Sequence, residues 1–246
     1  PPSKSGTYDI PVGVTAIGAS AFTGCFGLTG VSIPETVAAI GKKAFSGCAS
    51  LTGVTIPSGV AVIEDNAFSQ SGLTGVTIPD GVTAIGEAAF AYCDDLTSVV
   101  LGHGVTNIGQ MAFSDCPALT EAAFGSHVAA VGAHAFARCA MLDGLELPAG
   151  LTILGDYAFA HCSSLSGVTL PGSVAVVGDY AFSECVSLAD VTICDGVGVI
   201  GQGAFYGCLG LTEIAFSAVT AIGEYAFFGC TGLTRVTVTD LADWCG

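Results

Sequence analysis

The sequence predicts an α/β solenoid of about ten 23-residue repeats, each adding one strand to a parallel sheet. The dipeptide Ala-Phe recurs ten times in nearly fixed surroundings, at steps of 23 residues except for two of 22. Hydrophobic residues make up 51% of the chain and charged residues 11%, a balance that stacked repeats can bury. No stretch approaches the roughly 20 uninterrupted apolar residues of a membrane span. We therefore expect one elongated domain over 1–246, with repeats from about 8 to 238 and a C-terminal tail at 239–246.

Each repeat reads L-x-x-V-x-I-P-x-x-V-x-x-I-G-x-x-A-F-x-x-C-x-x. In residues 28–33 apolar residues alternate with small polar ones, which predicts a half-buried strand. Pro34 ends the strand because it has no N–H to donate. Ile40–Gly41 is expected to turn the chain, and Ala44–Phe45 to begin a short turn or a single helical turn. Stacking predicts a parallel sheet of about eleven strands on the concave face, with the turns on the convex face.

The repeat places the same residue types in columns through the core. Nine of the eleven cysteines follow the repeat phenylalanine by three residues, and no C-x-x-C pair is present. This spacing does not support a zinc or redox motif, so we expect a column of buried free thiols. Cys194 and Cys245 lie outside the column and are candidates for a reactive or bridging pair, although about two repeats separate them. The column residues are Cys25, Cys48, Cys93, Cys116, Cys139, Cys162, Cys185, Cys208 and Cys230.

Other patterns give no support for an enzyme or a cofactor. Residues 196–201 fit G-x-G-x-x-G, but Gly201 is the turn glycine of the repeat and no long helix follows. The four histidines occupy four different columns, so they cannot converge on a nucleophile. We predict no catalytic residue, no cofactor and no metal site. The histidines are His103, His127, His134 and His161.

The charge is strongly negative, with 21 acidic against five basic residues and a net charge of −16. It argues against nucleic acid or an anionic membrane surface as a partner. One acidic column precedes the Ala-Phe turn, where exposed N–H groups favour an anion. Calcium is conceivable for carboxylates, but no calcium-binding pattern appears. The column comprises Asp65, Glu87, Asp156, Asp179 and Glu224.

The exposed middle position of each strand supplies the candidate binding residues. They are Ser32, Thr55, Thr77, Glu146, Thr169, Thr192 and Thr237. Threonine is also favoured on a strand for β-propensity alone. A second stripe, Tyr157, Tyr180 and Tyr225, could contact sugars or proteins or could pack at the rim of the repeats.

The unit IPxxVxxIGxxAFxxCxxL closely resembles the BspA-like, or Treponema pallidum-type, class of leucine-rich repeats. The resemblance extends from about Tyr8 to Val238, and Asp240–Cys245 looks like the segment that follows the last repeat. It implies a right-handed leucine-rich-repeat superhelix without shared catalytic residues, on the cell surface or secreted. It also implies adhesion to host matrix proteins, host cells or other microbes. Proline is lost from the motif at Gly102, Gly125, Cys194 and Ser217.

Three classes of function remain open. The first is a non-catalytic interaction module that binds a protein or glycan on a host or microbial surface, without inserting into the membrane. The second is a spacer or array domain of a larger surface protein with no ligand of its own. The third is an ice- or crystal-face binder. Such proteins usually present two regular files of threonine, but here the second file gives way to Asp143, Ser166 and Ala189.

Overall fold

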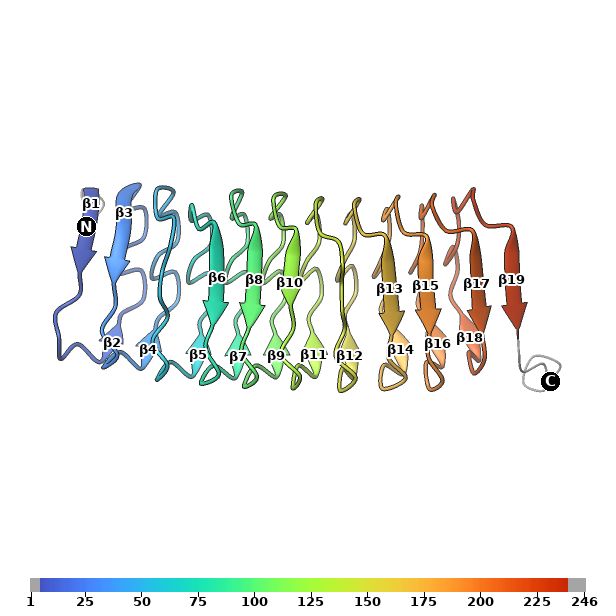
Figure 1. Ribbon diagram of the computed structural model, residues 1–246, viewed down its shortest axis with the longest axis horizontal. Helices are drawn as coiled ribbons and strands as arrows, with labels where there is room; N and C mark the ends of the chain where they lie inside the picture. The colour runs from blue at the N-terminus through green and yellow to red at the C-terminus, as the bar shows by residue number, and fades with distance from the viewer. Residues whose placement is uncertain (1–4, 239–246) are drawn as a thin grey trace.

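The computed structural model describes residues 5–238 and contains 19 β-strands in that range, with turns and no helix between them. Nine strands come from the L-x-x-V-x-I segments and form a row across the molecule (Figure 1). These long strands are β1 (Ser5–Asp9), β3 (Gly27–Ser32), β6 (Gly75–Ile78), β8 (Ser98–Leu101), β10 (Glu121–Ala123), β13 (Gly167–Leu170), β15 (Asp190–Ile193), β17 (Glu213–Phe216) and β19 (Arg235–Val238).

A second row consists of two-residue strands from the V-x-x-I-G segments. They are β2 (Ala16–Ile17), β4 (Ala39–Ile40), β5 (Val62–Ile63), β7 (Ala84–Ile85), β9 (Asn107–Ile108), β11 (Ala130–Val131), β12 (Ile153–Leu154), β14 (Val176–Val177), β16 (Val199–Ile200) and β18 (Ala221–Ile222). All pair in parallel and in chain order, which confirms a solenoid of about ten turns at a spacing of one repeat.

The sheets differ in one respect from the predicted single sheet of eleven strands. The continuous sheet is the ten-stranded one made by the short strands, at the position where only a turn was expected. The long strands form four separate sheets, β1–β3, β6–β8–β10, β13–β15 and β17–β19. Residues 51–56 and 142–147 have the strand sequence but no strand conformation. In the second segment Gly144 adopts a φ of +64°, which a β-strand does not accommodate.

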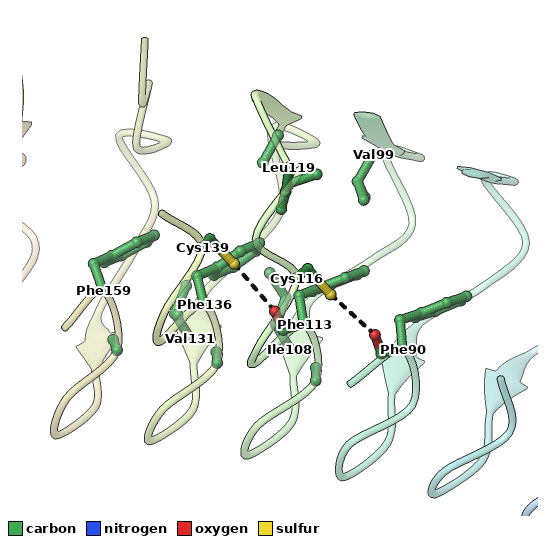
Figure 2. Packing of buried hydrophobic residues seen from close by; sticks show 14 of the residues in the cluster. Phe90, Val99, Ile108, Phe113, Cys116, Leu119, Val131, Phe136, Cys139 and Phe159 are labelled. Carbon is green, nitrogen blue, oxygen red and sulfur yellow. Dashed lines mark hydrogen bonds between the residues drawn. The ribbon is translucent and has the colours of Figure 1, made fainter. Parts of the chain in front are cut away.

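In the core, side chains at equivalent positions of successive repeats stack in columns. The repeat phenylalanines stack nearly parallel, as for Phe90 on Phe113 (ring centroids 5.2 Å apart, 3° between planes) and Phe136 on Phe159 (5.3 Å, 7°). Figure 2 shows these rings in one column, with the cysteine thiols beside them. Burying a phenylalanine contributes about 1.5–3 kcal/mol. Stacking identical side chains therefore lets an elongated chain bury a core that no single repeat could form.

The turn around Ala-Phe has an unusual backbone that places every repeat against the next one. The residues two before and two after the phenylalanine adopt positive φ, for example Lys43 (56°) and Gly47 (72°) around Phe45. With this conformation the N–H groups of residues 43, 45 and 47 donate to the carbonyl oxygens of residues 65, 67 and 69. The predicted turn is thus a second hydrogen-bonded ladder between repeats rather than a loop.

The turn glycine four residues before the phenylalanine is required by close backbone approach. A Cβ at Gly155 would lie 2.6 Å from the backbone nitrogen of Ala133 and 2.7 Å from the carbonyl carbon of Gly132. A Cβ at Gly201 would lie 2.6 Å from the carbonyl oxygen of Val177. The glycines of the G-x-G-x-x-G match therefore serve the stacking of repeats.

Candidate interaction surface

All seven residues predicted for binding are exposed and lie on the face formed by the long strands, which we call the long-strand face. They do not form an unbroken threonine file. Thr169 pairs directly with Thr192, whereas Thr77 pairs with Val100 and Thr237 with Ala215. Thr55 and Glu146 lie in the two segments that are not strands. The face is therefore polar but irregular along the stack.

Both segments that lack strand conformation, 51–56 and 142–147, coincide with depressions in the long-strand face. The larger, of about 730 Å³, has Gly30, Gly53 and Gly75 in its lining together with the side chains of Thr55 and Thr77. The other, of about 600 Å³, includes Glu121, Phe124 and Glu146 in its lining. Within the described chain, no backbone hydrogen bond joins residues 53–56 or 144–147 to a neighbouring repeat. Apart from the N–H of Gly144, which donates to the Asp143 carboxylate, their backbone N–H and C=O groups are available to a bound ligand.

Two threonine files lie on this side: an outer file that includes Thr55, Thr77 and Thr192, and an inner file that includes Thr74, Thr97 and Thr120. The hydroxyls of the two files have different roles. Hydroxyls of the inner file hold repeats together, since Thr97 donates to the carbonyl oxygen of Thr74 (2.8 Å) and Thr120 to that of Thr97 (3.0 Å). In the part of the chain that the structure describes, the hydroxyls of Thr55, Thr77 and Thr192 have no such bond. The outer file therefore offers uncommitted hydroxyls to a partner, whereas Thr74, Thr97 and Thr120 of the inner file use theirs between repeats.

The acidic column is partly used for structure, as its position predicts. The Asp65 carboxylate accepts from the N–H of Glu87 (3.0 Å) and from the Lys42 ammonium (2.7 Å). The Lys42 hydrogen bond holds the pKa of Asp65 below its usual range. Asp156 and Asp179 accept from the N–H of the following repeat in the same way (2.9 and 2.7 Å). Among residues 5–238, no group of three or more His, Cys, Asp or Glu side chains is placed to hold a metal ion.

The cysteine column consists of buried free thiols, as the spacing predicts. Burial raises the pKa of Cys139 to about 12 and that of Cys185 to about 12, so neither thiol is a nucleophile near neutral pH. Cys194 is a half-buried free thiol outside the column. Cys245, its proposed partner, and the tail segment Asp240–Cys245 lie outside the described residues.

Aromatic side chains gather on the turns, and only part of this surface was foreseen. Tyr157 stacks on Tyr180 (5.0 Å, 9°), as the predicted stripe requires. His134, known from the sequence only as one of the four histidines in separate columns, stacks on Tyr157 (4.7 Å, 3°). Tyr225 instead meets Phe228 edge-on (5.9 Å, 86°), because Gly203 interrupts its column. Tyr206 and Phe228 directly follow the repeat phenylalanine, at a position where the other repeats have Ser, Thr or Ala. This change to aromatic residues was the sequence signal by which both could have been predicted.

Comparison with known proteins gives the family. The profile of the BspA-type leucine-rich repeat region matches residues 15–143 and 130–243, with six copies of its repeat. The chain belongs to this family. None of the curated proteins matches it.

Several solved structures share the fold of this BspA-type chain. A leucine-rich repeat protein from Bacteroides ovatus is 32% identical, with a TM-score of 0.83 over 94% of this chain and 60% of its own. A leucine-rich cell surface protein from Faecalibacterium prausnitzii is also 32% identical, with a TM-score of 0.56 over 94% and 71%. The leucine-rich repeat protein of T. pallidum is 32% identical over 65% and 78%, with a TM-score of 0.62. The chain thus spans 60% of the length of the Bacteroides ovatus protein.

Residues 5–238 include no helix with the length and apolar character that a membrane span needs.

Proposed function

We propose that this chain is a non-catalytic adhesion module, on the cell surface or secreted, that binds a protein or glycan of a host or of another microbe through the long-strand face. The observation that carries the proposal is the coincidence of the two depressions with uncommitted groups. Thr55 and Glu146 both lie where the sheet is interrupted, and there backbone and side-chain polar groups face solvent together.

Family membership and the named relatives support the surface location. One structural relative is described as a cell surface protein, and the fold it shares with this chain is a stack of repeats that presents one extended face. Leucine-rich repeats present such faces as interaction surfaces. The Ser126 hydroxyl lies 3.3 Å from Nδ1 of His103, but both side chains are exposed. Polar contacts spread over several repeats favour a multivalent interaction over a single deep pocket.

The test is binding of the purified chain to immobilised extracellular-matrix proteins, host-type glycans and intact cells. The variant replaces the outer-file residues Thr55, Thr77, Thr169 and Thr192 with Lys. A matched control replaces the exposed short-strand residues Ala39, Val62, Ile153 and Val176 with Lys, which changes the net charge equally on another face.

Saturable binding that the threonine variant abolishes and the control retains supports adhesion through the long-strand face. Equal loss in both variants would mean that the added positive charge, rather than the face, disrupts binding, and would overturn the proposal. Absence of binding across the panel by the intact, folded chain would favour the spacer function instead.

A further inference from the structure

Six exposed or half-exposed rings form a strip along the turns of the C-terminal repeats, which we call the aromatic strip. Successive ring centroids lie 4.7 Å apart between His134 and Tyr157 and 5.0 Å between Tyr157 and Tyr180. Tyr180 and Tyr206 follow at 6.5 Å, and Tyr206 and Phe228 at 5.4 Å. The strip comprises His134, Tyr157, Tyr180, Tyr206, Tyr225 and Phe228.

The fold does not require aromatic residues at these positions. The same column, with the same positive φ, holds Ser20, Lys43 and Asn66 in the N-terminal repeats and Gly203 between Tyr180 and Tyr225. Tyr225 is 57% exposed and Phe228 58% exposed, so neither ring contributes its full area to the core. Large exposed aromatic side chains that the core does not need mark interaction sites.

The ring geometry limits what can bind. His134, Tyr157 and Tyr180 stack face to face, so a partner meets their edges and their polar atoms. The stack breaks at the C-terminal end, where Tyr206 is tilted by 52° to Tyr180 and Tyr225 stands at 86° to Phe228. Tyr206 and Phe228 stack on each other at 20°, but the Tyr225 and Phe228 side chains are 57% and 58% exposed, so ring surface remains open to solvent at this end. An open ring face attracts a cation.

The charge beside the strip is predominantly negative, and Arg138 at its N-terminal end is paired with Asp115. Three of its tyrosines follow an acidic residue directly, in Asp156-Tyr157, Asp179-Tyr180 and Glu224-Tyr225, and no Lys or Arg occurs between Arg138 and Arg235. Asp156 and Asp179 each use one carboxylate oxygen on a backbone N–H, which leaves the charge in place. At the N-terminal end a hollow of about 380 Å³ lies between His134, Tyr157 and the Arg138–Asp115 ion pair.

From this charge and geometry we infer that the aromatic strip is a second binding surface and that its partner is a cationic, Lys- or Arg-rich protein segment. Ammonium and guanidinium groups can lie over the open rings while the neighbouring carboxylates pair with them. A neutral glycan could donate hydroxyl hydrogen bonds to the carboxylates but would gain no ion pair from their charge, and an anionic one would be repelled. The surface is separate from the long-strand face, so its failure would leave the adhesion proposal untouched.

The probe is a fluorescein-labelled 12-residue peptide of alternating Lys and Ser, with a Glu/Ser peptide as its counterpart, followed by anisotropy in 0.15 M salt. One variant, Tyr180→Ser with Phe228→Ser, removes rings without changing charge. A second, Asp156→Asn with Asp179→Asn, keeps the hydrogen-bond acceptors and removes two charges. The control, Asp9→Asn with Glu121→Gln, removes two charges from the long-strand face.

We expect saturable binding of the Lys/Ser peptide alone, weakened about tenfold by loss of the rings and about fivefold by loss of the two neighbouring charges. The control should change the dissociation constant by less than about twofold. Thermal melting verifies each fold; Tyr180→Gly replaces a serine variant that fails to fold, since glycine suits the positive φ and occupies this column at Gly203.

Three results would overturn the inference. The intact chain could fail to bind the peptide. The control could weaken binding as much as the Asp156/Asp179 variant while the ring variant has no effect, which would show diffuse charge attraction. A neutral glycan could bind in a Tyr180- and Phe228-dependent way while the peptide does not, which would make the strip a glycan surface.

Discussion

The thiol of Cys139 donates a hydrogen bond to the backbone carbonyl oxygen of Phe113, one repeat earlier, at an Sγ–O distance of 3.2 Å (Figure 2). The same relationship recurs along the stack at 3.0–3.3 Å. It ties the cysteine column to the phenylalanine column and gives each buried thiol a polar partner. The remaining pairs are Cys48–Phe22, Cys93–Phe68, Cys116–Phe90, Cys162–Phe136, Cys185–Phe159, Cys208–Phe182 and Cys230–Phe205.

The buried thiols should make the fold sensitive to alkali. Burial raises the pKa of Cys48 to about 11 and that of Cys139 to about 12, whereas an unfolded thiol ionises near pH 8.5. Above pH about 8.5 the unfolded chain therefore loses protons that the folded chain keeps, and the free energy of unfolding should fall until the folded pKa is reached. Each thiol contributes up to about 1.4 kcal/mol per pH unit in this window.

Urea unfolding at pH 8, 9 and 10 measures this slope. Cys139→Ala should reduce the slope by up to about 1.4 kcal/mol per pH unit, because it removes one of the titrating groups. Cys194→Ala, at a half-buried site outside the column, serves as the control. An unchanged slope in Cys139→Ala would contradict the assignment.

Thiol reactivity should distinguish Cys194 from the column. We expect native-state alkylation at pH 8 to modify Cys194 rapidly, because that side chain is only half-buried. Cys162, fully buried and with its pKa raised by desolvation, should react only after unfolding. Peptide mapping after timed alkylation gives both rates. Labelling of the column thiols at the rate of Cys194 would mean that the repeats open readily.

Removal of one central ring should destabilise the whole stack. Phe136 is fully buried and contacts Phe113 (5.1 Å) and Phe159 (5.3 Å), so Phe136→Ala should lower the free energy of unfolding by about 3–5 kcal/mol. Phe26, which is 65% exposed, is the matched control, and Phe26→Ala should cost less than about 1 kcal/mol. Urea titration monitored by circular dichroism compares them. Similar losses would argue against a phenylalanine core.

Glycine substitutions should separate close approach from flexibility. In Gly155→Ala the new Cβ would lie 2.6 Å from the backbone nitrogen of Ala133, which cannot move without displacing a repeat, so we expect a loss of about 3 kcal/mol. Gly53 has no atom within 4 Å of its Cβ position and an ordinary φ. Gly53→Ala should therefore be neutral or stabilising by up to about 1 kcal/mol. Equal melting temperatures for the two variants would disprove the explanation.

The residues of the repeat determined the period, the phenylalanine and cysteine columns and the exposure of Thr55 and Thr192, because each depends only on the side-chain pattern within one repeat. Gly155 could be recognised from its column, although the reason for glycine there is close approach of the preceding repeat. The proposed long-strand surface follows from this pattern, although its role in binding remains a prediction.

The stacking of the repeats decided the pairing of the strand segments, the backbone of the turns and the contacts between aromatic side chains. Whether the segments 51–56 and 142–147 pair with their neighbours depends on hydrogen bonds between repeats, which no single repeat specifies. The positive φ at Lys43 and Gly47 is adopted because the next repeat supplies acceptors for the N–H groups between them. Tyr206 likewise joins the aromatic strip only because successive turns lie about 5 Å apart, which places rings from separate columns in contact. The sequence by itself determined what each repeat buries; only the packing of repeats decided what the surface presents.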